Sequence, residues 1–533
     1  MSRYVATPRL IWFTLRRDRV RIPVWILGIG LTVLGSVASF KSSYPTAADR
    51  QTRAAIVDNA VVKLFTGPGY GLTHYTFGAM TANELLPMTA LAVALMNIFL
   101  VVRHTRAEEE SERAELLGAT AVGRLAPTTA ALSVVFGADL ALGVLLTLGL
   151  PTSLHDLSPE GSLAFAAALV GVGFVFGAVA LLAAQLAVSA RGALGVSSMG
   201  LGAWYLLAAF GNMTGIGALS WLSPFGWAVE MRAYVDDRWW PLALALTTTI
   251  ALVAVAARVA SHRDLGAGLI ADRPGPPNAA RWLDDPLGLA FRLQRNSVLW
   301  WSVSLAFIGA VYGSITEQAG KLYHHVGSLE RYSAHIGASN AIDEYRALTL
   351  YIAVLVAGGF AVQAALRPRG EESAARADPV LSTAVSRSRW AGGHVLIALC
   401  GGVAALFLIG LGMGAADAIS VGDAGQLPRT IGAALAYTPA LWVLSGFAFA
   451  LFGLVPRATG AAWLVLGGVA FVGFFGPLLQ LPHWIYELSP MEHVPRLPVA
   501  SFSLPPLAVL LLIAVALLAA GFGGLRRRDV ATA

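Results

Sequence analysis

The sequence has 533 residues, of which 56% are apolar and only 13% are charged. Soluble domains carry about 25% charged residues, so this composition excludes an ordinary soluble protein and indicates a chain largely immersed in lipid, where charge is costly. The net charge of +6 comes from basic loop residues and requires no nucleic-acid partner, and the single cysteine, Cys400, excludes an intrachain disulfide.

Apolar runs that could cross a bilayer recur along the whole chain, since a spanning helix needs about 20 such residues. They predict an all-α membrane protein with about twelve transmembrane helices. The spans are expected near residues 22–40, 84–102, 126–150, 162–189, 193–212, 241–260, 299–315, 346–366, 390–416, 430–455, 459–480 and 504–523. Tight turns at Arg191 and Arg457 leave a merged or broken helix as the alternative at two of the junctions.

The basic residues indicate the orientation of the chain. The first 21 residues contain six arginines and no cleavable apolar signal, so the N-terminus is expected to be retained, with the first span as the insertion signal. Lysine and arginine are concentrated in the segments that lie on the same side of the predicted membrane as the N-terminus, and cytoplasmic loops carry such an excess. Both termini are therefore predicted to be cytoplasmic. Arginine outnumbers lysine 34 to 3, which is typical of a GC-rich bacterial genome and favours the bacterial cytoplasmic membrane as the location.

An amphipathic stretch precedes the first span of each half, at 8–20 and at 286–298. In the first stretch Leu10, Phe13 and Leu15 are interspersed with arginines. This pattern favours a helix that lies in the membrane interface, and a cytoplasmic extension of the span is the alternative.

The chain contains an internal repeat. Residues 106–124 align without gaps to 369–387, with nine of nineteen residues identical, and Leu222-Ser223-Pro224 recurs as Leu488-Ser489-Pro490. Because equivalent motifs fall on the same side of the predicted membrane, the chain is expected to be two parallel six-helix repeats. The expected divisions are a first half, 1–270, a Pro-rich cytoplasmic linker, 271–285, and a second half, 286–533.

The repeated segment is an acidic cytoplasmic loop after the second span of each half. Glu109 and Arg113 are spaced for an i,i+4 pair, and Glu372 and Arg376 repeat that spacing. A charged helix is expected here that could receive force from a cytoplasmic partner, and a solvated loop helix is the alternative. In the second copy Pro379 is expected to break the helix early.

This loop and its surroundings resemble the permease subunits of ABC-2-type exporters, particularly the fused two-half permeases that export polyketide antibiotics. The resemblance covers essentially the whole chain and implies a type V exporter-like fold. It implies ATP-driven export of a hydrophobic or amphipathic compound from the cytoplasm or inner leaflet, powered by a separate ABC ATPase, most simply two copies, that carries the ATP and Mg. The residues that it implies for coupling to the ATPase are Glu108, Glu109, Glu110, Arg113, Glu371, Glu372, Arg376 and Asp378.

An apolar and aromatic excursion, 213–240, follows the fifth span, and its second copy is 481–503. Tryptophan prefers the membrane interface, and Ser-Pro favours a helix start. The resemblance implies a pair of short re-entrant helices that cap the outer side of the pathway, and an ordinary aromatic belt is the alternative. The residues assigned to this outer gate are Trp221, Ser223, Pro224, Phe225, Trp227, Ser489 and Pro490.

Asp139 lies inside the third predicted span, where a carboxylate is costly and suggests a function. It could line the transport pathway, bind a cationic substrate, or bond a neighbouring helix through Asn97 or Gln185. Its counterpart in the second half is Gly402.

Motifs for catalysis are missing from the sequence. A P-loop requires lysine after glycine, but Phe40 precedes Lys41 in the nearest candidate, and neither H-E-x-x-H nor G-x-S-x-G occurs. We therefore expect no enzyme and no cofactor in this chain. No metal is expected either, because His324-His325 and His335 have neither a cysteine nor a cluster of acidic residues nearby.

Two other functions remain open at this point. A secondary transporter of the major-facilitator type also has twelve spans in parallel halves, but it usually carries a Gly…Asp-Arg motif where this chain is rich in glutamate. A non-transporting scaffold or sensor could use the acidic segments only to dock a partner.

Overall fold

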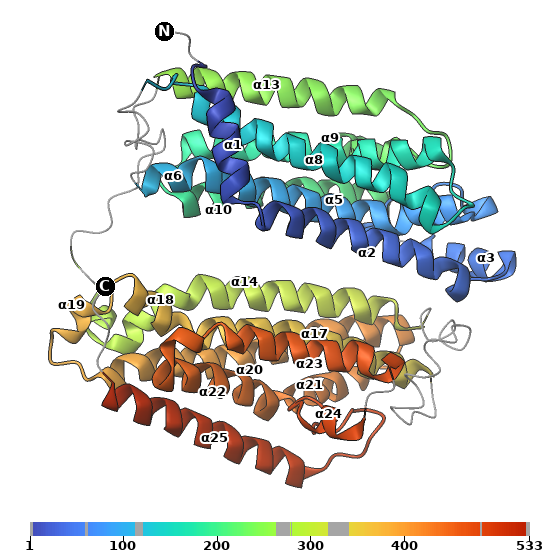
Figure 1. The fold of residues 1–533 in the computed structure, drawn as a ribbon. Coiled ribbons are helices and arrows are strands. Elements are labelled where there is room, and N and C mark those ends of the chain that lie inside the picture. The colour runs from blue at the N-terminus through green and yellow to red at the C-terminus, as the bar shows by residue number, and fades with distance from the viewer. Residues whose placement is uncertain are drawn as a thin grey trace. The chain divides into compact units, whose positions relative to one another are not determined.

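The computed structural model describes residues 4–58, 62–111, 121–262, 278, 280–317, 341–479 and 482–528. Throughout these ranges the regular structure is helical, without strands, as the hydropathy pattern predicts. The chain divides into two compact units, Met1–Gly275 and Pro276–Ala533. In each unit the long helices run side by side (Figure 1).

Six long helices form the first unit. They are α2 (Arg21–Ser43), α5 (Phe77–His104), α8 (Ala126–Ser153), α9 (Pro159–Leu186), α10 (Ala190–Thr214) and α13 (Trp240–His262). Helices α5 and α9 are the most buried, whereas α2, α10 and α13 keep exposed apolar faces, as lipid-facing helices do. The shorter helices are α1 (Thr7–Arg17), α3 (Ala47–Val57), α4 (Lys63–Thr66), α6 (Arg106–Glu110), α11 (Gly217–Trp221) and α12 (Pro224–Glu230).

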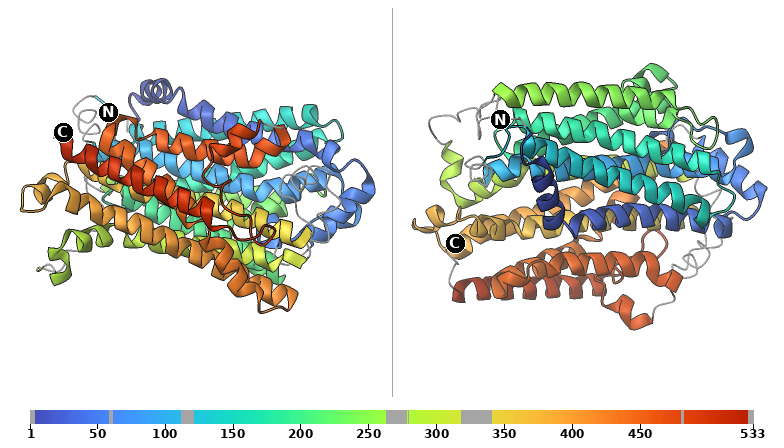
Figure 2. Two further views of the ribbon diagram at one scale, coloured as in Figure 1. Left: turned by 90° about the horizontal axis from the view of Figure 1, so that it is seen from below. Right: turned by 45° about the horizontal axis from the view of Figure 1, so that its top comes forward.

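Helix α1 is separate from the first span, because the chain turns at residues 18–20 before α2 begins. It lies across the direction of the long helices (Figures 1 and 2) and packs on α8, where Ile11 joins a small cluster with Val134 and Ala138. Trp12 and Phe13 remain exposed. The predicted separate amphipathic helix is therefore present in the first half.

The second unit contains α14 (Pro286–Ser314), α17 (Ala341–Ala365), α20 (Arg387–Val421), α21 (Gln426–Leu435), α22 (Thr438–Leu454), α23 (Ala461–Leu479) and α25 (Leu504–Arg527). Short helices α18 (Arg367–Ser373), α19 (Asp378–Leu381) and α24 (His483–Glu487) connect them. Helices α14 and α20 pack so closely that a Cβ on Gly309 or Gly412 would overlap the facing backbone.

The prediction of a second separate amphipathic helix at 286–298 is wrong. These residues are the start of α14, which continues without a break into the span. When Pro8 is aligned with Pro286, Asn296 stands where Asp18 marks the turn in the first unit. The carboxylate that holds the turn of the first unit is therefore missing from the second.

Eleven helical segments in the described ranges are long and apolar enough to cross a membrane. The remaining predicted span, 459–480, corresponds to α23, an apolar helix over Ala461–Leu479. The predicted span 430–455 is divided between α21 and α22, because Pro439 lacks the N–H group that a continuous helix would need. The chain is therefore an all-α integral membrane protein.

Candidate functional site

The acidic segment of the first unit begins where α5 ends. Thr105 leaves the helical conformation (φ −122°, ψ −87°), and α6 starts at Arg106. The buried Arg106 guanidinium donates to the Val188 carbonyl oxygen from Nε at 2.8 Å and to Glu109 from Nη1 at 2.5 Å. Because Val188 lies between α9 and α10, this arginine fastens α6 to that connection.

The neighbouring glutamates fasten α6 to two further elements. Glu108 accepts from Arg17 Nη1 of α1 at 2.7 Å. Glu110 accepts from the Ala190 backbone N–H at 2.9 Å, in the first turn of α10 where such groups lack helical partners. Glu108 and Glu110, two of the carboxylates that the resemblance assigned to coupling, therefore hold α6 against its own unit.

A buried ionic cluster joins the turn between α1 and α2 to the same place. Both carboxylate oxygens of Asp18 accept from Arg103, at 3.1 and 3.2 Å, and His104 Nε2 lies 3.1 Å from Asp18. Burial alone would raise the pKa of Asp18, but the hydrogen bonds from Arg103 and the nearby positive charges outweigh it and lower the pKa. Arg17 also bonds His104 Nδ1 at 2.9 Å, so α1, α2, α5 and α6 meet in one network.

The acidic segment of the second unit is held by different partners. Glu371 pairs with Arg367 at 2.9 Å and with Arg376 at 2.8 Å. Glu372 is buried and accepts from both Nη atoms of Arg528, at 2.6 and 2.8 Å, at the C-terminal end of α25. Helix α18 is therefore tied to the last span, whereas α6 is tied to α1, the short helix that precedes the first span.

Two details of the predicted acidic helices differ from the structure. Arg376 bonds Glu371, not Glu372 as the spacing predicted. Helix α18 ends at Ser373, Ala375 adopts a positive φ of 52°, and Asp378 begins the separate helix α19, so the early break expected from Pro379 is present. Arg113 and the rest of 112–120 lie outside the described residues.

The excursion of the first unit contains two short helices, α11 and α12. Ser223 accepts from the Phe225 N–H at 3.2 Å and caps α12, and Trp227 Nε1 donates to the Trp221 carbonyl oxygen at 2.7 Å. Phe225 is buried, with its ring centroid 5.4 Å from those of Phe176 on α9 and Tyr205 on α10. These contacts seat the excursion, with Pro224 buried, against the middle parts of α9 and α10.

The second copy of the excursion differs from the first. Helix α24 corresponds to α11, but Ser489 and Pro490 lead into turns, and residues 488–503 contain no helix like α12. Pro495 and Pro498 follow within a few residues, and neither has the backbone N–H group that a helical hydrogen bond requires. The expectation of a pair of short helices therefore holds in the first half only.

Asp139 is bonded to a neighbouring helix. Asn97 Nδ2 of α5 donates to Asp139 Oδ1 at 2.8 Å, whereas Gln185 bonds the Leu181 carbonyl oxygen of its own helix. An apolar groove of about 400 Å³ lies between α8, α9 and α13, and Leu140, but not Asp139, lines it.

Comparison with known proteins assigns the family. Residues 283–526 match the family described as multidrug efflux system permease Rv1217c, C-terminal domain. The chain is 40% identical over 536 residues to multidrug efflux system permease protein Rv1217c of Mycobacterium tuberculosis, covering 99% of this chain and 96% of that protein. The chain belongs to this permease family. The sequence-based resemblance to ABC-2-type exporter permeases is confirmed, and the secondary-transporter and scaffold alternatives are not favoured.

The permease also contains a polar cluster in each unit that the sequence did not predict. In the first unit Tyr70 donates to Glu230 at 2.5 Å, and Arg232 lies over the Tyr70 ring at 4.0 Å. Burial and Glu230 raise the pKa of Tyr70 to about 12. This tyrosine–glutamate–arginine cluster joins the end of the excursion to the segment before α5.

The same three residue types meet in the second unit. Tyr351 of α17 donates to Glu492 at 3.1 Å, Glu492 pairs with Arg496, and Arg496 lies 5.7 Å from the Tyr351 ring. The tyrosines are at unrelated positions of the repeat, so alignment of the halves could not reveal the likeness. Each cluster anchors the excursion of its own unit.

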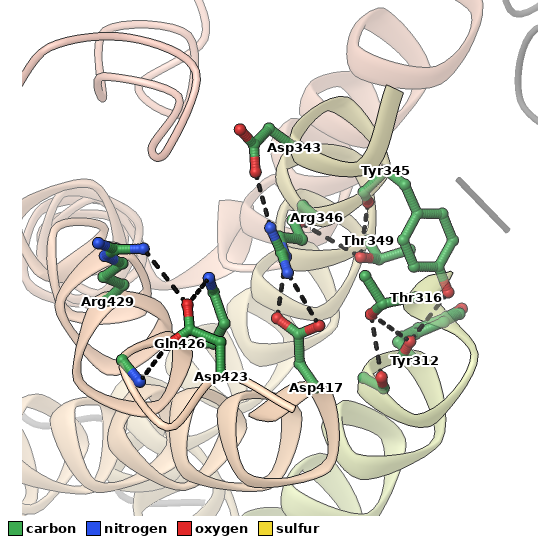
Figure 3. A network of polar contacts seen from close by, with 12 residues as sticks. Tyr312, Thr316, Asp343, Tyr345, Arg346, Thr349, Asp417, Asp423, Gln426 and Arg429 are labelled. Atoms are coloured by element: carbon green, nitrogen blue, oxygen red, sulfur yellow. Dashed lines mark hydrogen bonds and ion pairs between the residues drawn. The ribbon is translucent and has the colours of Figure 1, made fainter. Parts of the chain in front are cut away.

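A buried ion pair in the second unit was also missed. Arg346 of α17 donates to Asp417 of α20 from Nε at 2.8 Å and from Nη2 at 3.1 Å, and a third bond reaches Asp343 at 2.8 Å (Figure 3). The Asp417 side chain is 0% exposed. The pair cross-links α17 and α20 at the end of α17 opposite α18.

Proposed function

We propose that this permease is the membrane-spanning subunit of an ATP-driven ABC exporter in the bacterial cytoplasmic membrane. It moves a hydrophobic or amphipathic compound, such as an antibiotic, a drug or a lipid-like molecule, out of the cytoplasm or the inner leaflet. The observation that carries this proposal is the 40% identity, over nearly the full chain, to a multidrug efflux system permease.

The motor of this exporter is a separate ABC ATPase, present as two copies that hold the ATP and Mg. The permease itself is not an enzyme, since none of its three lysines stands in a P-loop sequence. Both termini and both acidic segments face the cytoplasm, as the distribution of basic residues favours.

The ATPase copies dock on the exposed sides of α6 and α18. The glutamates at 108, 109, 371 and 372 are engaged inside the permease, so they position the docking surface instead of forming it. The exposed positions are Glu110 and Ser111 in the first unit, and Gly370 and residues 373–376 in the second. Movement of α6 is transmitted through Arg17 to α1, and movement of α18 is transmitted through Arg528 to α25.

This docking is tested by placing a large cation on each exposed surface. The permease is co-expressed with the ABC ATPase encoded beside its gene, and Ser111→Arg and Ser373→Arg are compared with wild type. Ala48→Arg, on the exposed face of α3 at the other end of the first unit, is the matched control. We expect the first two variants to lose co-purification with the ATPase and substrate-stimulated ATP hydrolysis, while their thermal unfolding stays like that of the control.

Three results would contradict the proposal. Full coupling in the double variant Ser111→Arg/Ser373→Arg would show that the ATPase binds elsewhere. ATP hydrolysis by the purified permease alone would refute a separate motor. Equal accumulation of fluorescent hydrophobic compounds in cells with and without the permease and its ATPase would refute export.

A further inference from the structure

The side chains of Asp139 and Asn97 form an isolated polar pair in the apolar interior of the first unit. Asp139 is 1% exposed and Asn97 is fully buried. Asn97 Nδ2 donates to Asp139 Oδ1 at 2.8 Å and to the Val93 carbonyl oxygen at 3.0 Å. Both amide hydrogens of Asn97 are therefore used.

One oxygen on each side chain has no hydrogen-bond partner within the described ranges. These atoms, Asp139 Oδ2 and Asn97 Oδ1, are both buried. If Asp139 is ionised, both oxygens can only accept hydrogen bonds, so they cannot bond each other. Buried polar atoms are nearly always bonded, so this pair is short of one hydrogen.

Among the described residues of α8 and of the helices packed against it, no positive charge lies beside Asp139 to compensate its ionised form. Helix α8 has no other charged residue, and the helices packed against it have their charged residues toward their ends. These residues are Arg9, Arg16 and Arg17 on α1, Arg21 and Lys41 on α2, Glu84, Arg103 and His104 on α5, and Glu160 on α9. Of these, Arg103 is six residues from Asn97, about 9 Å along the helix, and its guanidinium is bonded to Asp18.

Helix α9 closes over the pair with two glycines. A Cβ at Gly173 would lie 2.6 Å from Asp139 Oδ1, and a Cβ at Gly177 would lie 3.0 Å from Asn97 Oδ1. The polar pair therefore occupies a notch between α5, α8 and α9 that larger residues in α9 would fill.

We propose that Asp139 holds a proton, which its Oδ2 donates to Asn97 Oδ1, so that the two side chains form a closed acid–amide pair. One proton then satisfies both unbonded oxygens and removes the charge from the membrane interior. The site binds a proton, and it cross-links α5 to α8. Because the counterpart of Asp139 is Gly402, the second unit has no such pair at the equivalent position.

Infrared spectroscopy of the full-length permease, with its aspartates carbon-13 labelled, tests the proton directly. At neutral pH we expect the carbonyl stretch of a protonated carboxyl, sensitive to D2O, that is absent from Asp139→Asn and retained in Asp417→Asn. A wild-type spectrum without that band, or a band that survives in Asp139→Asn, would overturn the proposal.

Thermal unfolding of the same variants gives an independent test. Asp139→Asn is expected to unfold at the wild-type temperature, because the new amide N–H takes the place of the acid O–H. Asn97→Leu is expected to unfold at a lower temperature, because it leaves Asp139 unbonded. Asp417→Asn is the matched control and should also unfold lower, since its carboxylate accepts two bonds from Arg346. Equal losses for Asp139→Asn and Asp417→Asn would mean that both aspartates are ionised.

Discussion

Removal of Arg346 is expected to destabilise the second unit strongly. The Arg346 and Asp417 side chains are 9% and 0% exposed, and two hydrogen bonds join them (Figure 3). Arg346→Met keeps most of the side-chain volume but leaves the Asp417 carboxylate buried without its cation. Breaking one partner of a buried pair costs about 3–5 kcal/mol, well above the roughly 0.6 kcal/mol average of hydrogen bonds between membrane helices.

The reverse substitution is expected to cost less. In Asp417→Leu the guanidinium of Arg346 still has Asp343, at 2.8 Å, on the more exposed side of the network. The double variant Arg346→Met/Asp417→Leu removes both charges, and exchange of a buried pair for apolar residues is often neutral. It should therefore recover most of the stability that the arginine variant loses.

The measurement is the free energy of unfolding in mixed micelles titrated with denaturing detergent. The matched control is Arg389→Met, which removes the cation of a pair with Asp285 whose side chains are 66% and 49% exposed, and such pairs are worth about 0–1 kcal/mol. If Arg346→Met costs no more than Arg389→Met, or if the double variant is no better than the single one, burial of the pair does not control its contribution.

Three further predictions concern the contacts that hold α1 and the excursions. Asp18→Asn should lower the free energy of unfolding by about 1–3 kcal/mol at neutral pH. The pKa of Asp18 in the folded protein lies below its unfolded value near 3.9, so the wild type loses this advantage in stability as the pH falls through the folded pKa. Arg17→Met removes a half-buried ion pair with Glu108, so it should lower the free energy of unfolding by about 1 kcal/mol and increase protease cleavage around α1. Unchanged cleavage would contradict the role of this pair in holding α1 against α6. Tyr70→Phe and Tyr351→Phe each remove a hydrogen bond to a carboxylate, worth about 1.5–3 kcal/mol. Amide hydrogen exchange should rise in 213–240 for Tyr70→Phe and in 481–503 for Tyr351→Phe. A rise in both segments for either variant would refute separate anchoring.

The long helices could be predicted because their signal is local. A run of about 20 apolar residues identifies a span whatever it packs against, so the prediction erred mainly at helix boundaries, where single residues decide. Helix α14 continues through 286–298 because no Asp18-like residue holds a turn there, and the separation of α21 from α22 depends on a single residue, Pro439.

The partners of the polar residues could not be predicted, because they are distant in the sequence. The internal repeat located Glu108 and Glu372 at equivalent positions, but it could not show that one meets Arg17 and the other Arg528. Nor could it choose between Asn97 and Gln185 as the partner of Asp139. Arg346 and Asp417 fell at the edges of the predicted spans 346–366 and 390–416, where a charge is ordinarily assigned to a loop.

The two acidic segments began as copies of one sequence and now have different mechanical connections. In the first unit α6 is bonded to α1 and to the start of α10, and the adjoining Asp18 cluster includes the turn into α2. In the second unit α18 is bonded to the end of α25, and the continuous α14 provides no such turn. An ion pair at each segment, Arg17–Glu108 in the first unit and Arg528–Glu372 in the second, connects it to a terminal helix of its unit. Equal movements imposed on α6 and α18 by identical partners would therefore reach α1, before the first span of one half, and α25, the last span of the other. Sequence duplication in this permease therefore does not imply that its two halves respond alike.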